Sequence, residues 1–237
     1  MIKIFLRHRP LQGKKEWVQW KKRKGEGENG DQTVGGASVA ALTEAESERL
    51  TALLPESRRE RLLRVKDPAR WREPLCAYLL LRLALREACG WEELPDIALS
   101  SQGKPCFPDA LGVHFNLSHT SGAVLVGLSD QPIGVDIERI RPMSPASLER
   151  LAAGVAEQDF FPCWVRREAR AKLDGTHMGA LLRTEMPLRD GEFYYPLDTF
   201  PGYATGMATR SPEMPGQVRL ISLDEWIQEM VLTFSQE

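Results

Sequence analysis

The sequence has 237 residues, of which 42% are hydrophobic, so it can bury the core of one large domain or two small ones. A formal net charge of -2 excludes a chain-wide electrostatic attraction to nucleic acid or anionic membranes. No apolar run reaches the roughly 18 residues of a membrane span, the four cysteines lack metal-type spacing, and no signal peptide is recognisable. We therefore expect a cytoplasmic protein with free thiols that binds neither nucleic acid nor membrane.

Hydrophobic periodicity, capping residues and turn residues divide the chain into strands and helices. The stretch 74–88 is apolar on nearly every side, which predicts a buried central helix that ends at Gly90. Thr43 and Glu46 have the spacing of a capping box at the start of an earlier helix. In chain order, we predict a strand at 1–6, helices at 43–54, 56–65 and 74–88, a strand at 97–99, a strand that ends in a polar turn at 116–120, strands at 124–128 and 133–137, helices at 147–153 and 160–173, strands at 192–195, 203–209 and 218–221, and a short helix at 223–230.

Two basic segments lie in the first half of the chain. Residues 14–24 surround two tryptophans with lysines and arginines and lead into a Gly-rich stretch at 25–36. This composition favours a solvated face beside a mobile loop over a docking site for an acidic partner. Lys66, Arg70 and Arg72 precede the buried helix, and they fit an exposed basic helix as well as a phosphate cradle.

The order strand, helices, strands occurs twice, and the turn near residues 130–131 divides the two occurrences. We therefore predict an α+β fold of two similar α/β halves, 1–130 and 131–237, packed face to face. A ligand site is expected in the cleft between them. The halves share the order of their elements and no recognisable sequence identity.

The stretch 114–138 carries the clearest indication of chemistry. Asp136 and Glu138 are two apart on a predicted strand, so their side chains point to the same face. Two carboxylates so close repel each other unless a positive group lies between them. A hard divalent cation, with phosphate oxygens completing its shell, is the simplest such group. Upstream, the polar stretch 116–120 offers a hydroxyl, an imidazole and backbone N–H groups, which suit an anion.

Trp164, Glu168 and Lys172 are four apart and share one face of the helix predicted at 160–173. By itself this spacing favours an amphipathic helix with an i,i+4 ion pair. A D-x-E strand is equally weak evidence by itself, and a Gly-Lys-Pro turn is weaker still. A histidine such as His119 is more often structural than a ligand contact. The joint presence of these features, in this order, favours a functional site.

Together these blocks resemble the signature motifs of the Sfp-type 4'-phosphopantetheinyl transferases, and the resemblance extends over most of the chain. It includes the Arg-rich helix ahead of the buried one. The resemblance implies a pseudo-twofold monomer that moves the 4'-phosphopantetheine moiety of coenzyme A onto a serine of an apo acyl or peptidyl carrier protein and releases 3',5'-ADP. Fatty-acid, polyketide and nonribosomal peptide synthesis are all open as pathways. The matching blocks are Gly103-Lys104-Pro105, Phe115-Asn116-Leu117-Ser118-His119, Gly134-Val135-Asp136-Ile137-Glu138, Trp164…Glu168…Lys172 and Pro201-Gly202-Tyr203.

The resemblance also implies residue roles. Asp136, Glu138 and Glu168 would surround a Mg²⁺ that also binds the pyrophosphate of coenzyme A, since Mg²⁺ prefers a few carboxylates plus phosphate oxygens and water. Glu168, directly or through a water, is the candidate base for the serine hydroxyl, and Lys172 would add a positive charge at the pyrophosphate. The implied coenzyme A contacts are Ser118, His119, Arg70 and Arg72 for the 3'-phosphate, and Lys104 and Pro105 for the adenylate.

The chain departs from the family pattern at three places. Arg167 stands where the family usually has lysine, and it keeps the charge but not the ammonium geometry. The stretch between Glu138 and Trp164 is short, which predicts a smaller carrier-docking surface, and the run after Gly175 differs from the family's usual loop. The intact acidic trio favours an enzyme. Two alternatives stay open: a diverged relative that modifies a narrow or unusual target, and a non-catalytic module that binds coenzyme A or a carrier. A two-metal phosphodiesterase is disfavoured, because the four histidines are scattered along the chain.

Overall fold

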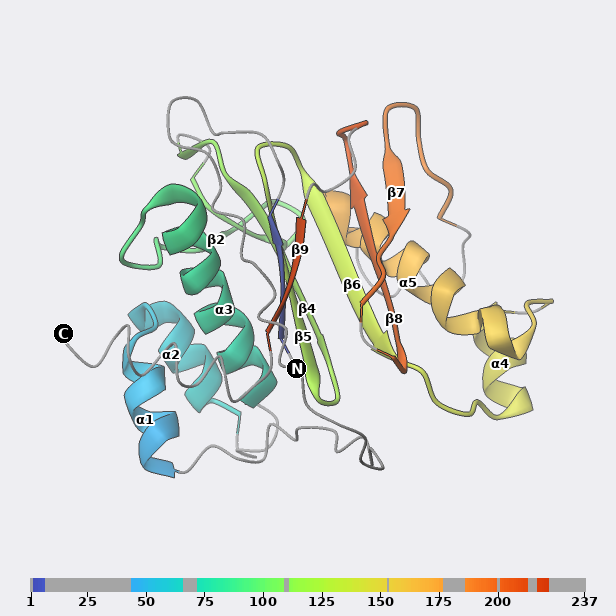
Figure 1. Cartoon of the computed structure of the whole chain (residues 1–237), viewed down its shortest axis with the longest axis horizontal. Helices are drawn as coiled ribbons and strands as arrows, with labels where there is room; N and C mark the ends of the chain where they lie inside the picture. The colour runs from blue at the N-terminus through green and yellow to red at the C-terminus, as the bar shows by residue number, and fades with distance from the viewer. Residues whose placement is uncertain are drawn as a thin grey trace, which may run out of the picture.

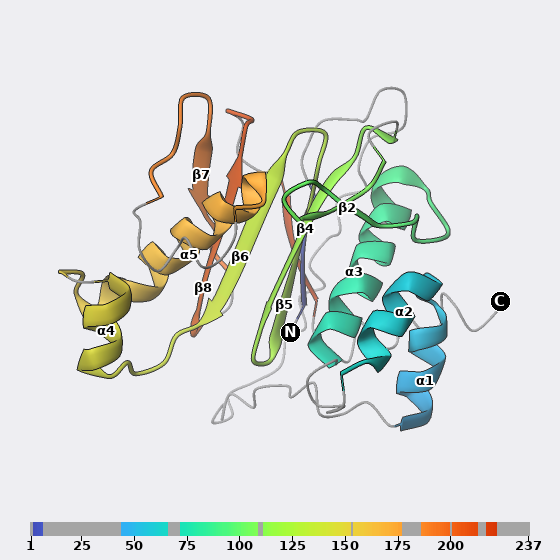
Figure 2. The same ribbon diagram turned by 180° about the vertical axis from the view of Figure 1, so that it is seen from behind.

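The computed structural model describes residues 2–6, 44–65, 72–108, 111–152, 154–176, 186–199, 201–212 and 217–221. The fold is α+β, as predicted, and its described residues form two larger sheets side by side, with helices packed against each, and one small two-stranded sheet (Figures 1 and 2). The helices are α1 (Glu44–Ala52), α2 (Glu56–Leu63), α3 (Arg72–Cys89), α4 (Pro145–Ala152) and α5 (Glu157–Asp174). The strands are β1 (Ile2–Leu6), β2 (Ala98–Leu99), β3 (Pro105–Cys106), β4 (His114–Thr120), β5 (Ala123–Ser129), β6 (Ile133–Arg139), β7 (Phe193–Pro196), β8 (Tyr203–Thr209) and β9 (Gln217–Ile221).

The first sheet has the strand order β4-β5-β1-β9, with β1 parallel to β5 and antiparallel to β9. β4 and β5 form a hairpin whose turn contains Gly122, and the φ of 77° at this position suits glycine. α3 packs across the sheet against β5 and β1 (Figure 1). Because β9 pairs with β1, the second half of the chain returns to the sheet that the first strand opens.

The second sheet is antiparallel and has the order β6-β8-β7. α5 packs against β6 and β8, and α4 packs against α5. The approach of α5 to β6 depends on Gly134, because a Cβ at this position would collide with backbone atoms of Ala169 and Leu173. The glycine of the predicted D-x-E strand therefore sets how closely the helix lies on the sheet.

β5 is buried on both of its faces and connects two parts of the hydrophobic core. Successive side chains of a strand point to opposite faces, so Val124 and Val126 pack in the core under α3, whereas Ala123 and Leu125 face the second sheet. The residues that Ala123 and Leu125 join there are Ile133, Val135, Ile137 and Met207. The two sheets thus share a core, which holds β6 beside the β4–β5 hairpin.

Most of the predicted elements are confirmed to within a few residues, including the buried central helix, which ends at Cys89 just before Gly90. The turn predicted at 116–120 is wrong, because β4 continues through Thr120 and the chain reverses only at residues 121–122. The polar residues of this stretch therefore lie on a strand. The division of the chain at 130–131 and the pseudo-twofold relation of the halves stay predictions. The side chains of the capping box (Thr43 and Glu46), the segment 14–36 and the helix at 223–230 lie outside the described residues.

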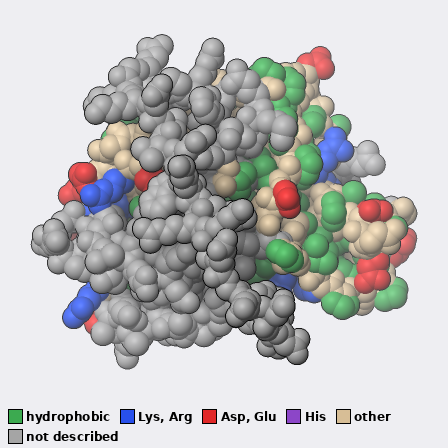
Figure 3. Space-filling model, in the orientation of Figure 1, with side chains coloured by type: hydrophobic (Ala, Val, Ile, Leu, Met, Phe, Trp, Pro, Cys, Tyr) green, Lys and Arg blue, Asp and Glu red, His purple; other side chains and the backbone are tan. Residues whose placement is uncertain are grey.

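Charged side chains are mixed in sign on the described surface. On the face in Figure 3, acidic and basic side chains are scattered among hydrophobic ones over the second sheet and its helices. This mixture agrees with the net charge of -2. None of the helices in the described part of the chain is long and apolar enough to cross a membrane.

Candidate functional site

One face of β6 carries the two acidic residues of the D-x-E strand toward α5. Gly134, Asp136 and Glu138 alternate with the core residues of β6, and α5 lies directly over Gly134. Asp136 is buried and bonds to Lys172 on α5, while Glu138 lies farther toward the end of the strand and is half-buried. The two carboxylates therefore share a face, as the spacing predicts, and this face is the one that the helix covers.

α5 supplies the other two charged groups of the site. Glu168 and Lys172 are four residues apart and lie on the same side of the helix, where Lys172 Nζ is 3.4 Å from Glu168 Oε2. The same ammonium nitrogen is 2.5 Å from Asp136 Oδ1 and 3.0 Å from the hydroxyl of Ser118. The helix ends immediately afterwards at Gly175, which has the left-handed conformation of a helix C-cap. Side chains of β4, β6 and α5 thus meet at one ammonium group.

The carboxylates of the site strongly affect each other's ionisation. Burial, together with the charges of Asp136 and Glu138, raises the pKa of Glu168 to about 7, although the Lys172 ammonium opposes this shift. Burial and the neighbouring Asp136 also raise the pKa of Glu138. Burial alone would lower the pKa of Lys172, but the carboxylates of Asp136 and Glu168 outweigh it and raise this pKa above its usual value. The site therefore concentrates more negative charge than a single ammonium group neutralises.

The donor set of the site fits a hard divalent cation. Among the described residues, no three His, Cys, Asp or Glu side chains already form a metal-binding group. The Lys172 ammonium contacts both Asp136 and Glu168. Asp136 Oδ2, however, is buried and has no hydrogen-bond partner within the described part of the chain. A buried carboxylate oxygen without a partner is costly, and a cation with oxygen ligands would satisfy it.

Ser118 and His119 lie next to each other on β4 and differ in their surroundings. The Ser118 hydroxyl is buried and donates a hydrogen bond to Asp136 Oδ1 at 2.7 Å. The His119 side chain is exposed. Since adjacent side chains of a strand point to opposite faces, the hydroxyl and the imidazole do not approach a ligand from the same side. The structure brings Ser118 to the carboxylate site and leaves His119 at the surface.

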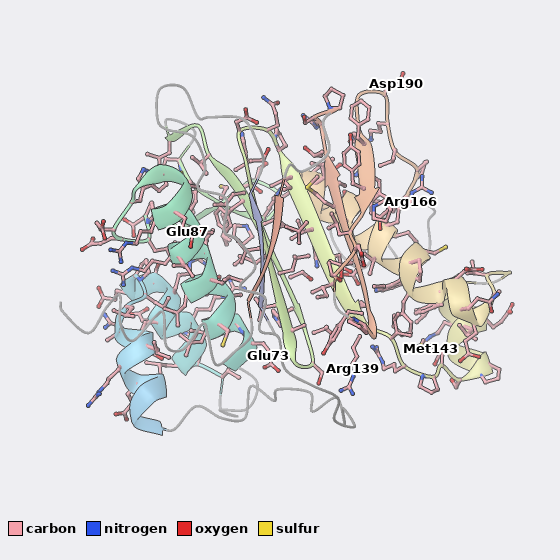
Figure 4. The ribbon with its side chains drawn as sticks, viewed as in Figure 1. Glu73, Glu87, Arg139, Met143, Arg166 and Asp190 are labelled. Atoms are coloured by element: carbon pink, nitrogen blue, oxygen red, sulfur yellow. The ribbon has the colours of Figure 1, made fainter. Side chains whose placement is uncertain are left out.

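The strands β4 and β6 end side by side, and α3 begins at the same end of the molecule. Figure 4 labels Glu73, in the first turn of α3, and Arg139, at the end of β6, and both lie at the same end of the molecule. Arg72 begins α3, but its side chain lies outside the description, as does all of Arg70. The end of β4 lies beside the end of β6, since the Thr120 hydroxyl is 3.4 Å from Glu138 Oε2.

Lys104 connects the Gly-Lys-Pro turn to the second sheet and its helix. Its ammonium group donates hydrogen bonds to the carbonyl oxygens of Ile133, at 2.7 Å, and Leu173, at 3.0 Å. Burial lowers the pKa of Lys104 to about 8, against the opposing charge of Asp174. The side chain thus ties the start of β6 to the last turn of α5. Pro105 follows it as the first residue of β3.

Two arginines that sequence reasoning did not place at the site have clear positions. Arg141 lies 3.3 Å from Glu138 Oε2 and over the ring of Phe161, with 5.1 Å between its guanidinium carbon and the ring centroid. No spacing rule predicts this contact, because Glu138 lies on a strand and Arg141 in the segment that follows it. Arg167 turns away from the carboxylates, stacks on Trp164 and donates to the carbonyl oxygen of Leu151 at 2.8 Å, which fastens α4 to α5.

Comparison with known proteins gives three informative similarities, although no family model matches the chain. The 4'-phosphopantetheinyl transferase Sfp of Bacillus subtilis strain 168 is 27% identical over 214 residues, which span 78% of this chain and 94% of that protein. The 4'-phosphopantetheinyl transferase ffp of Bacillus subtilis is 27% identical over 211 residues, or 77% of this chain and 94% of that protein. The 4'-phosphopantetheinyl transferase AcpT of Escherichia coli strain K12 is 37% identical over 99 residues, which cover 35% of this chain and 50% of that protein.

Proposed function

We propose that the chain is an enzyme of the Sfp-type 4'-phosphopantetheinyl transferases, to two of which it is 27% identical over more than three quarters of its length. It transfers the 4'-phosphopantetheine moiety of coenzyme A to a serine of an apo acyl or peptidyl carrier protein and releases 3',5'-ADP. The similar proteins are named 4'-phosphopantetheinyl transferases, which supports phosphopantetheine transfer, and the sequence motifs support the same reaction. The proposal includes a monomer of two related halves, with the reaction in the cleft between them, acting in the cytoplasm.

The observation that carries the proposal is the convergence of Asp136, Glu168 and Lys172 from a strand and a helix far apart in the sequence. Phosphoryl transfer demands little covalent chemistry from a protein and a great deal of charge stabilisation and positioning. The site provides parts for this task, because its carboxylates are buried beside a fixed ammonium and Asp136 Oδ2 has no hydrogen-bond partner in the described part of the chain.

Asp136, Glu138 and Glu168 would hold a Mg²⁺. When bound, Mg²⁺ offsets negative charge on the pyrophosphate of coenzyme A. Lys172 adds its own positive charge beside the same pyrophosphate, and its raised pKa keeps it protonated. Fixed charges of this kind stabilise the charge that develops on the departing 3',5'-ADP.

Glu168 is the group best suited to take up the proton of the serine hydroxyl. Burial beside Asp136 and Glu138 raises the pKa of Glu168 to about 7 in the metal-free site. A bound cation would lower this pKa and keep Glu168 ionised, so that it could accept the proton directly or through a water. In the proposed reaction the serine oxygen bonds to the β-phosphorus of coenzyme A, the bond to 3',5'-ADP breaks, and the hydroxyl proton passes to Glu168.

The remaining predicted residues are proposed to bind coenzyme A. His119, exposed at the end of β4, would contact the 3'-phosphate of coenzyme A together with Arg70 and Arg72. Lys104 and Pro105 would lie beside the adenylate, although the ammonium group of Lys104 already bonds to two backbone carbonyls. Fatty-acid, polyketide and nonribosomal peptide carriers are all candidate acceptors.

Incubation with coenzyme A, Mg²⁺ and a panel of apo carriers tests the proposal, with intact mass as the readout. The expected result is a gain of one phosphopantetheine on a carrier, lost when a chelator replaces Mg²⁺ and lost in the Asp136→Asn variant. An Sfp-type relative serves as the control that the carriers are competent. If that control modifies the panel and this protein does not, the proposal is wrong, and coenzyme A binding without transfer favours a binding module.

A further inference from the structure

Three polar residues of β4 face the neighbouring strand of the other sheet. β4 is the edge strand of the first sheet and β6 is the edge strand of the second, and no backbone ladder pairs these two strands among the described residues. Asn116, Ser118 and Thr120 alternate along β4, so their side chains lie on the same face. We call them the β4 polar ladder.

The β4 polar ladder takes the place of backbone pairing along the free edge of β6. Asn116 Oδ1 accepts a hydrogen bond from the buried backbone N–H of Val135 at 2.8 Å. Ser118 Oγ accepts one from the backbone N–H of Ile137 at 3.4 Å. Buried backbone donors need such partners, so these contacts fix where β6 lies against β4. They fix the position of the carboxylate that β6 carries between the two donors.

The second and third residues of the ladder also contact the carboxylates themselves. Ser118 Oγ donates to Asp136 Oδ1 at 2.7 Å and accepts from Lys172 Nζ at 3.0 Å. Thr120 Oγ1 lies 3.4 Å from Glu138 Oε2. A serine hydroxyl has one donor and two acceptor positions, and the contacts to Asp136, Lys172 and Ile137 occupy all three.

We propose that Ser118 is a positioning residue that orients the Asp136 carboxylate for the cation, and that its hydroxyl does not bind the 3'-phosphate of coenzyme A. This inference rests on the proposed function, and it revises the role that the family resemblance implies for Ser118. The imidazole of His119, on the opposite face of β4, is then the side chain of this pair that recognises the phosphate.

Binding measurements on Ser118→Ala test the inference without relying on turnover. Mn²⁺ serves as the metal probe, followed by the loss of the free-ion electron paramagnetic resonance signal. Loss of an outer-shell partner of a metal ligand weakens metal binding by about 10- to 100-fold, and we expect a weakening of this size. Calorimetric titration with coenzyme A and with 3'-dephospho-coenzyme A is expected to show the same preference for coenzyme A as in the wild type.

Ser129→Ala is the matched control. Ser129 is also buried, lies at the end of the β4–β5 hairpin farthest from its turn, and accepts a hydrogen bond from the backbone N–H of Gln131. This control should bind Mn²⁺ as the wild type does. Thr120→Val, which removes the contact to Glu138, should also weaken Mn²⁺ binding. Ser118→Cys, which keeps the volume and removes the hydroxyl, decides the question if Ser118→Ala does not fold.

Unchanged Mn²⁺ affinity in Ser118→Ala overturns the inference, and so does a loss of the preference for coenzyme A over 3'-dephospho-coenzyme A. The second result would make the hydroxyl a phosphate ligand. The outcome is separable from that of the proposed function, because metal and coenzyme A binding are measured without a carrier. A wild type that binds both ligands but never transfers refutes the proposed reaction and leaves the role of Ser118 decided by these titrations.

Discussion

Replacing Lys172 with methionine removes the ammonium group that lies between two buried carboxylates. Lys172 Nζ is 2.5 Å from Asp136 Oδ1 and 3.4 Å from Glu168 Oε2, and these two acidic side chains are only 2% and 9% exposed. Methionine fills a similar volume and carries no charge, so the substitution tests the ion pairs with little change in packing. In the absence of metal, the variant holds a cluster of carboxylates without their ammonium partner.

The expected loss of stability follows from the burial of these groups. Removing one partner of a buried ion pair costs about 3–5 kcal/mol, because the other charge stays buried. Glu168, whose pKa is raised to about 7, can take up a proton and lessen the penalty. We therefore expect a free energy of unfolding lower by about 3 kcal/mol in metal-free Lys172→Met, the low end of that range.

Urea unfolding with and without Mg²⁺ is the assay. A ligand that binds only the folded state at about 100 times its dissociation constant adds about 2.7 kcal/mol, and the variant should gain more than the wild type because no ammonium competes with the cation. Lys104→Met is the matched control, since Lys104 bonds to the backbone carbonyls of Ile133 and Leu173 and not to a carboxylate. If Mg²⁺ raises the free energy of unfolding by the same amount in Lys172→Met and in the wild type, the reasoning is refuted.

Three further substitutions test the account. Because the pKa of Glu168 rises from 4.5 to about 7 on folding, the folded metal-free protein keeps a proton that the unfolded chain has lost. Its free energy of unfolding should therefore fall as the pH rises across this interval, and Glu168→Gln should reduce that slope in pH-dependent urea titrations and leave the part that Glu138 contributes. Gly134→Ala places a Cβ against the backbone of Ala169 and should lower stability by about 1–3 kcal/mol; an unchanged urea midpoint would contradict the packing of α5. His119→Ala should raise the KM for coenzyme A by about 10-fold or more and leave that for 3'-dephospho-coenzyme A unchanged, whereas equal changes would exclude a phosphate contact.

The parts of the site that depend on local periodicity could be predicted from the sequence. A strand places residues two apart on one face, which puts Asp136 and Glu138 together. A helix does the same for residues four apart, which puts Glu168 beside Lys172. Neither rule needs knowledge of the rest of the chain, because each depends only on the geometry of one element.

The contacts between distant segments could not be predicted in this way. The polar stretch 116–120 resembles a turn in composition. Its side chains instead form hydrogen bonds with the backbone and the Asp136 carboxylate of β6, across the boundary between two sheets. Only the packed fold shows this boundary. Likewise, Lys104 reaches the carbonyl oxygen of Leu173, 69 residues away. The pairing of β1 with both β5 and β9 is also long-range, and hydrophobic alternation in a strand does not specify its partners.

The central claim is that carboxylates from β6 and α5 hold one divalent cation. Crystals grown with coenzyme A and Mn²⁺, measured for anomalous scattering, test it most directly. The account predicts a Mn²⁺ peak bonded to oxygens of Asp136, Glu138 and Glu168, with Lys172 Nζ displaced from Asp136 toward the pyrophosphate. A Mn²⁺ peak away from these three side chains, with the contact between Lys172 and Asp136 intact, would contradict it.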